Sequence, residues 1–297
     1  MQITAVSTSK TTQASAFLLY LVGGLLVFSF GANTFDLFPT NRNILYEWIL
    51  TAVLLLAAIA MQREPRGRIF SGIASALFIA SAGNAINLSL GNFLAPIFNI
   101  RGDDMRFLAI DKLSQAVPIV LTILLLTLWR GEGLSDLFLV KGDLRLGLRF
   151  GLISFAVWAV IFIVVVMVQA NAPVTQGLFG SGVGVGTIVA SIPWILMFCF
   201  VNSFMEELWF RGVSLQKLTP ALGWTASIIV TALVFGSTHG AATYVMPVQA
   251  VLFSGIVIVL GLVNAYIMLK TRSIWASVFF HAGYDLMVII PLLVQPG

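Results

Sequence analysis

Two adjacent carboxylic acids, Glu206 and Glu207, stand in a long apolar run of the sequence, and Arg211 follows them by one helical turn. Ionisable side chains at hydrocarbon depth are costly and usually functional. Successive residues on a helix point about 100° apart, so the two acids face different directions, whereas Glu207 and Arg211 share a face. The spacing therefore predicts a structural ion pair between Glu207 and Arg211, and it leaves Glu206 available for chemistry.

The sequence holds two histidines, His239 and His281, and each lies in an apolar run. Phe235 precedes His239 by one turn, and Asp285 follows His281 by one turn. Taken alone, each histidine could be a hydrogen-bonded packing residue, with Asp285 as a partner of His281. Three separate packing roles are a less economical explanation than one site that the two histidines share with Glu206.

The helices that must carry these residues place them at similar depth. We expect the apolar runs 187–218 and 224–239 to form an antiparallel hairpin that turns near residues 220–223. At a rise of about 1.5 Å per residue, Glu206 and His239 then lie level within a few ångströms. His281 rises from the same side of the membrane and reaches that depth with helix tilt. The three side chains can therefore face one cavity.

Such a cavity is suited to two kinds of chemistry. A carboxylate beside a histidine can hold and deprotonate a water for attack on a carbonyl, while His281 and Asp285 stabilise the developing oxyanion. Alternatively, Glu206, His239 and His281 are the ligand types of a catalytic zinc site that keeps one position open for water. The residue types do not choose between a metal-free site and a Zn²⁺ site.

The composition is that of an all-α, polytopic transmembrane helical bundle. Hydrophobic residues make up 59% of the 297 residues and charged residues 9%, which excludes an ordinary soluble domain. The net charge of +4 comes from Lys and Arg in short loops between apolar runs, so we expect it to orient the chain in the bilayer rather than to bind nucleic acid. The single cysteine, Cys199, lies in an apolar run and forms neither an intramolecular disulfide nor a cysteine metal cluster.

The apolar runs predict eight or nine membrane spans. They cover residues 14–30, 44–61, 69–90, 114–129, 150–168, 187–218, 224–239, 248–269 and 275–294. The count is eight if the first run is cleaved as a signal peptide or lies flat, and nine if it spans. An uncharged, glycine-rich connection at 171–186 separates N-terminal transmembrane helices, 1–186, from a catalytic transmembrane core, 187–297.

Three motifs in that core resemble a known family. The sequences EELWFR at 206–211, FGSTH at 235–239 and HAGYD at 281–285 are similar in order and spacing to EExxxR, FxxxH and HxxxN of the CAAX-protease and bacteriocin-processing (Abi, or CPBP) family of intramembrane proteases. The similarity covers about a third of the chain. EExxxR alone is a weak signal, whereas the three motifs together in apolar helices are a strong one.

The resemblance implies a multi-pass membrane enzyme that cleaves peptide bonds near the membrane surface, expected in the bacterial cytoplasmic membrane. Glu206 would be the water-activating base, His239 its partner at the water or metal, and His281 a further ligand or oxyanion donor. Expected partners are membrane lipid and a peptide or membrane-protein substrate, lipidated or not. Eukaryotic members of the family process prenylated proteins.

One residue departs from the family's pattern. Asp285 stands where the prenyl-protease members have Asn, and an ionised Asp accepts hydrogen bonds only. We expect it to be protonated, or to orient His281 or a metal. This difference argues against the processing of prenylated proteins, but it does not affect the assignment of the protein as a hydrolase. Two other classes stay open: a proton-coupled membrane transporter, because buried Glu and His also build proton relays, and a catalytically silent membrane protein of the bacteriocin-immunity type.

Overall fold

The computed structural model describes residues 9–31, 40–102, 105–171, 185–243 and 247–293, and within these ranges the chain is helical and contains no strand. The elements in chain order are α1 (Lys10–Leu25), the π-helical segment η1 (Leu26–Phe30), α2 (Thr40–Arg63), α3 (Arg68–Leu90), the short α4 (Leu94–Ile97), α5 (Met105–Trp129), the 3₁₀ turn η2 (Leu134–Leu137), α6 (Leu144–Asn171), α7 (Val185–Glu207), the π-helical segment η3 (Leu208–Leu215), α8 (Gln216–Thr243), α9 (Pro247–Thr271) and α10 (Trp275–Leu293). Most of the glycine-rich connection predicted at 171–186 lies outside the described residues.

Seven stretches of the described residues are long and apolar enough to cross a membrane. They are Lys10–Phe30, Arg42–Arg63, Arg68–Leu90, Met105–Trp129, Leu144–Met167, Ile188–Gly240 and Val248–Thr271. The 53-residue stretch Ile188–Gly240 contains both of the predicted spans 187–218 and 224–239. The predicted span 275–294 corresponds to α10. The prediction of a polytopic helical bundle is confirmed.

The hairpin predicted near residues 220–223 is made by one glycine. Gly223 has φ 73° and ψ 168° inside an otherwise helical segment, a conformation that residues with a Cβ rarely adopt. It breaks α8 into an arm that continues α7 and η3 and an arm that carries Phe235 and His239. Because Glu206 and His239 are nearly equidistant in sequence from this break, they come level when the second arm folds back.

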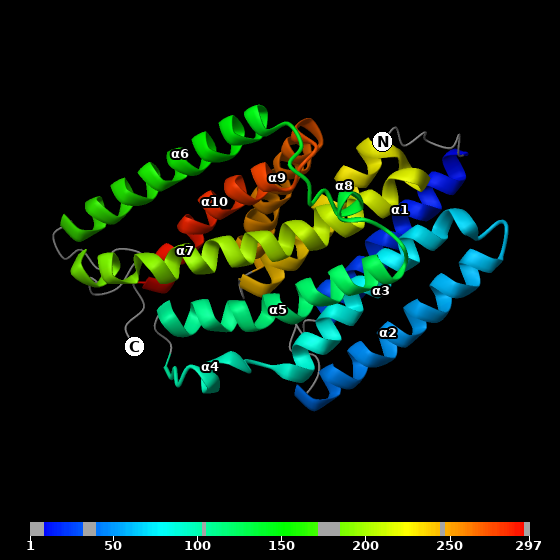
Figure 1. Cartoon of the computed structure of the whole chain (residues 1–297), viewed down its shortest axis with the longest axis horizontal. Coiled ribbons are helices and arrows are strands. Elements are labelled where there is room, and N and C mark those ends of the chain that lie inside the picture. Colours follow the sequence, from blue (N-terminus) through cyan, green and yellow to red (C-terminus); the bar gives the residue numbers. More distant parts are fainter. Residues whose placement is uncertain (1–8, 32–39, 103–104, 172–184, 244–246, 294–297) are drawn as a thin grey trace.

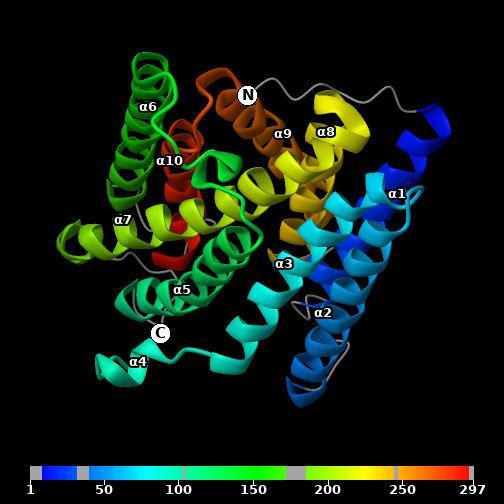
Figure 2. The ribbon, with the colours of Figure 1, turned by 45° about the vertical axis from the view of Figure 1, so that its right-hand side comes forward.

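Helix α7 runs through the middle of the molecule (Figure 1). It packs against α5 and α10, while α10 also packs against α6, α8 against α9 and α1, and α2 against α3. Figure 2 shows α1, α2 and α3 grouped at one end of the bundle and α6 and α10 at the other. The helices that carry the three motifs, α7, η3, α8 and α10, are therefore held between two groups of helices.

The outer surface is apolar, as hydrocarbon solvent requires. On α6, for example, Ile153, Val160 and Val164 are more than half exposed. The largest buried cluster lies inside, where η1 meets η3: the ring of Phe28 packs 4.9 Å from that of Trp209 and 4.5 Å from that of Phe210. The first membrane helix thus supports the segment that directly follows the two acids.

Candidate active site

Glu207 is the structural centre of the motif region. Its fully buried carboxylate forms an ion pair with Arg211, with Nη1 3.1 Å from Oε1, as the i,i+4 spacing predicts. Asn264 Nδ2 on α9 donates to Oε1 at 3.0 Å, and Ser277 Oγ on α10 donates to Oε2. His281 Nδ1 contacts Oε1 at 2.7 Å. One buried acid therefore joins α7, η3, α9 and α10, and the predicted ion pair with Arg211 is present.

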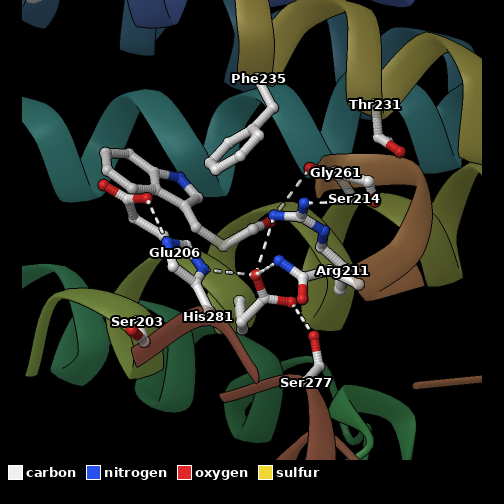
Figure 3. Close-up of polar contacts among 12 residues, drawn as sticks. Ser203, Glu206, Arg211, Ser214, Thr231, Phe235, Gly261, Ser277 and His281 are labelled. Carbon is white, nitrogen blue, oxygen red and sulfur yellow. Dashed lines mark hydrogen bonds and ion pairs between the residues drawn. The ribbon is translucent and has the colours of Figure 1, made fainter. Parts of the chain in front are cut away.

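Glu206 points away from this centre and towards both histidines. Its Oε2 atom lies 3.3 Å from His239 Nε2 and 3.5 Å from His281 Nε2. Figure 3 shows Glu206 and Arg211 on opposite sides of the cluster, with His281 between them. The structure thus brings together the three residues that we expected to share one cavity, from α7, the second arm of α8, and α10.

The hydrogen bonds fix which face of each imidazole is available. His239 Nδ1 lies 2.8 Å from the carbonyl oxygen of Phe235, which can only accept, so Nδ1 carries a hydrogen. Nε2 of His239 is then the nitrogen that faces Glu206. His281 Nδ1 likewise donates to Glu207, so its Nε2 atom also faces the Glu206 carboxylate. Both rings are held by one nitrogen and present the other to the same acid.

Asp285 lies beside His281 rather than beside the open side of the site. Its Oδ1 is 3.5 Å from His281 Nε2, and its Oδ2 accepts from Asn202 Nδ2 at 3.1 Å. The Ser203 hydroxyl is 3.1 Å from the same Oδ2. Asp285 thus lies next to His281, and its role, as an orienting or a protonated residue, stays a prediction.

Phe235 supports the cluster through its ring. The ring lies 4.3 Å from that of His239 and 5.8 Å from that of His281, and the Arg211 guanidinium carbon is 4.3 Å from its centre. The Arg211 guanidinium also donates to the carbonyl of Gly261 at 3.4 Å. A cation held over a desolvated aromatic face gains about 2 kcal/mol. The phenylalanine of the second motif therefore contacts residues of all three motifs.

Access to the site is one-sided. The side chains of Glu207, Arg211 and His281 are at most 1% exposed, whereas Glu206 is 12% and His239 27% exposed. Within the described residues, Glu206 Oε2 is buried and has no hydrogen-bond donor. An acceptor oxygen in that position is suited to a water or to a polar group of a substrate. The open face is the one made by Glu206 and His239.

The metal expectation can be tested against this geometry. Glu206, His239 and His281 have the donor types of a catalytic zinc site. Among the described residues, however, no three His, Cys, Asp or Glu donors are arranged so that they could hold one metal ion. A Zn²⁺ site therefore stays a prediction, and the chemistry below is derived from the protein groups alone.

Three supporting residues had no assigned role in the sequence analysis. Asn264 and Ser277 donate to Glu207, and Asn202 donates to Asp285. The signal that could have found them is a lone polar residue in an apolar run, which is expensive unless it has a partner. That signal is weak, because many such residues only bond to their own helix, as Thr231 does.

Comparisons with known proteins agree with the motifs. Residues 188–287 match the family model of type II CAAX prenyl endopeptidase Rce1-like proteins. The match begins in α7 and ends in α10, so it contains every residue of the cluster described above. No curated protein and no solved structure matches the chain. Over residues 188–287, this membrane-embedded helical chain is thus similar to the Rce1-like CAAX proteases, as its three motifs predict.

Proposed function

We propose that the protein is an intramembrane endopeptidase that hydrolyses a peptide bond with a water activated by Glu206 and His239. The observation that carries the proposal is the convergence of Glu206 Oε2 with both imidazole Nε2 atoms, at 3.3 and 3.5 Å, on the one exposed side of a buried polar cluster. Ionisable side chains are costly inside an apolar bundle, and a functional role is their usual explanation.

The first step is activation of water. A water at the exposed side of Glu206 and His239 donates one hydrogen to the Glu206 carboxylate and the other to His239 Nε2, which leaves a lone pair of its oxygen directed at a substrate carbonyl. Glu206 takes the proton as the water oxygen forms a bond to the carbonyl carbon. A general base at this position supplies about 10²- to 10⁴-fold of rate acceleration.

The second step is collapse of the tetrahedral intermediate. When the water oxygen adds, the carbonyl electron pair moves to oxygen, and His281, as an imidazolium whose Nδ1–H is held by Glu207, donates a hydrogen bond from Nε2–H to that oxyanion. The oxyanion then re-forms the carbonyl as the carbon–nitrogen bond breaks, and Glu206 gives its proton to the departing amine. Asp285 acts as a positioning residue, because it contacts His281 and is itself held by Asn202.

The substrate class follows from where the site lies. Glu206 and His239 lie in the stretch Ile188–Gly240, which is long and apolar enough to span the membrane, so we expect a scissile bond to enter from the lipid phase or from its boundary. This favours a peptide segment that is membrane-embedded or lipidated. The presence of Asp285 in place of the family's Asn is the reason for not restricting the proposal to prenylated proteins.

The test uses purified protein in liposomes with a panel of internally quenched membrane peptides. We expect cleavage by the wild type, a loss of at least about 100-fold in kcat/KM for Glu206→Gln, and a similar loss for His239→Ala. The matched control is Glu64→Gln, an exposed acid outside the cluster, which should cleave like the wild type. Equal cleavage by Glu206→Gln and Glu64→Gln refutes the mechanism, and substrate uptake by a protein that cleaves nothing would favour a transporter.

The same preparation decides the role of zinc. Metal content of the folded protein, and cleavage before and after treatment with a chelator, distinguish a zinc-dependent hydrolase from one that uses Glu206 and the histidines alone. A stoichiometric metal that is lost in His239→Ala and His281→Ala would assign these residues as ligands.

A further inference from the structure

A second cavity lies away from the acids and histidines, between the start of α6 and the start of α10. Its volume is about 410 Å³, and its walls are mostly apolar: Leu139, Leu144, Leu148, Trp275 and Phe279 contribute to them. Figure 1 shows α6 and α10 side by side along this region. The size and lining fit one hydrocarbon chain, which the proposed reaction leaves without a role.

The mouth of this cavity is built by two segments that are bonded to one another. Ile274 N donates to the Phe138 carbonyl at 3.0 Å, and Asp143 N donates to the Thr271 carbonyl at 2.8 Å. Ser273 Oγ donates to the Val140 carbonyl at 2.6 Å. These bonds fix residues 138–143 against residues 271–274, so cations from both segments gather at one place.

Four cations meet there. Lys141 lines the cavity itself, Arg145 follows one helical turn later, and Lys270 and Arg272 come from the opposing segment. All four side chains are exposed, and in the part of the chain that the structure describes none is in an ion pair with an acid. One acid, Asp143, lies between Lys141 and Arg145 in sequence, and its carboxylate accepts from the backbone N–H of Leu146. Four cations against one acid leave the mouth with a net positive charge.

We infer that this cavity binds an anionic phospholipid, with an acyl chain in the apolar part and the phosphate group among Lys141, Arg145 and Arg272. Short loops rich in Lys and Arg are typical of the cytoplasmic side of a membrane protein, where anionic lipids concentrate and where each nearby cation contributes about a fivefold preference for them. Charge complementarity selects this lipid over a zwitterionic one.

The bound lipid would also support the catalytic helix. Trp275 lines the cavity, and its ring stacks on that of Phe204, with ring centres 5.4 Å apart. Phe204 lies on α7 two residues before Glu206. An acyl chain packed against Trp275 would therefore restrict the motion of this side chain, which contacts α7 through Phe204.

The test measures lipid retained by the detergent-purified protein with native mass spectrometry, after exposure to equal amounts of phosphatidylglycerol and phosphatidylcholine. The wild type should retain phosphatidylglycerol preferentially. The triple variant Lys141→Gln, Arg145→Gln, Arg272→Gln should lose on the order of 100-fold of that preference. The matched control is Arg63→Gln, Arg66→Gln, Arg68→Gln, three exposed arginines of another short loop, which should retain it.

A second variant tests the cavity rather than the charge. A Cβ at Gly147 would meet only Ala276 Cβ, at 3.9 Å, so Gly147→Leu can extend into the cavity without disturbing the backbone. It should abolish phosphatidylglycerol retention with all four cations in place and thermal unfolding unchanged. Three outcomes would each overturn the inference. They are an equal loss of lipid preference in the two triple variants, unchanged phosphatidylglycerol retention in Gly147→Leu, and equal retention of both lipids by the wild type. A peptidase-inactive protein would leave this result unaffected.

Discussion

Replacement of Arg211 by Met should be among the most destabilising single changes in this protein. Arg211 is 1% exposed, pairs with Glu207 at 3.1 Å, donates to Gly261 and lies over the Phe235 ring. Met preserves much of the side-chain volume but leaves a buried carboxylate without its cation. Removing one partner of a buried pair costs about 3–5 kcal/mol, because the remaining charge keeps its desolvation penalty. At 1.4 kcal/mol per tenfold, this is roughly a 100- to 4000-fold shift of the unfolding equilibrium.

The assay is denaturant unfolding in mixed micelles, followed by far-ultraviolet circular dichroism. The double variant Glu207→Gln, Arg211→Met removes both charges, so it should cost less than about 2 kcal/mol and be more stable than Arg211→Met alone. An internal comparison is Lys217→Met, which breaks the more exposed pair with Glu132 and should cost about 1 kcal/mol. A double variant that loses the sum of both single losses, or an Arg211→Met protein as stable as Lys217→Met, would refute the argument that one desolvated ion pair holds the motif.

Three further outcomes are expected. Asp285→Asn should fold normally and keep activity within about tenfold of the wild type, because the amide oxygen can still accept hydrogen bonds from its neighbours. Asp285→Ala should lose more activity. Thermal unfolding and kcat/KM are the measurements that check both variants. Gly261→Ala should lower stability by about 1–3 kcal/mol in the same denaturation assay, since a Cβ there would meet three heavy atoms at 3.2–3.3 Å. Burial raises the pKa of Glu132, but Lys217 and Arg130 more than offset it, so the pKa lies below its ordinary value. The stability advantage of the wild type over Glu132→Gln should therefore be complete above about pH 5 and shrink as the pH falls through about 4.

Each of these outcomes has a contrary result. Inactive Asp285→Asn with normal folding would mean that the carboxylate charge, not its hydrogen bonds, is needed by His281. Unchanged stability in Gly261→Ala would mean that the helices separate easily at this contact. A pH-independent difference between the wild type and Glu132→Gln would show that the ion pair with Lys217 contributes nothing to folding.

The sequence predicted the parts of the site that helical spacing controls. The i,i+4 relation of Glu207 and Arg211 determines their ion pair, and equal rises on two arms of a hairpin bring Glu206 and His239 level. Gly223 and the nearby proline indicate the turn, because a left-handed backbone conformation favours glycine. These features are local, and local geometry can be read from one chain.

The sequence could not predict which long-range partner completes each polar group. Asn264 and Ser277 are single polar residues in apolar runs, and nothing local says that both will reach the carboxylate of Glu207. Nor does the sequence mark η1 and η3 as π-helical, although the extra residue per turn changes which side chains face inwards along Leu208–Leu215. The contact between these two segments depends on how the bundle closes, so only a structure can show it.

The order in which the helices are synthesised matters for assembly of the site. Phe28 contacts Trp209 and Phe210, and α10 carries His281. The segment η1, which is synthesised before α7, packs against the residues that follow Glu207, whereas α10, which is synthesised after α8 and α9, contributes His281. A nascent chain that lacks α10 has its acids in place but no second imidazole. We therefore expect that the cluster of Glu206 and the two histidines assembles only after α10 has been synthesised and inserted.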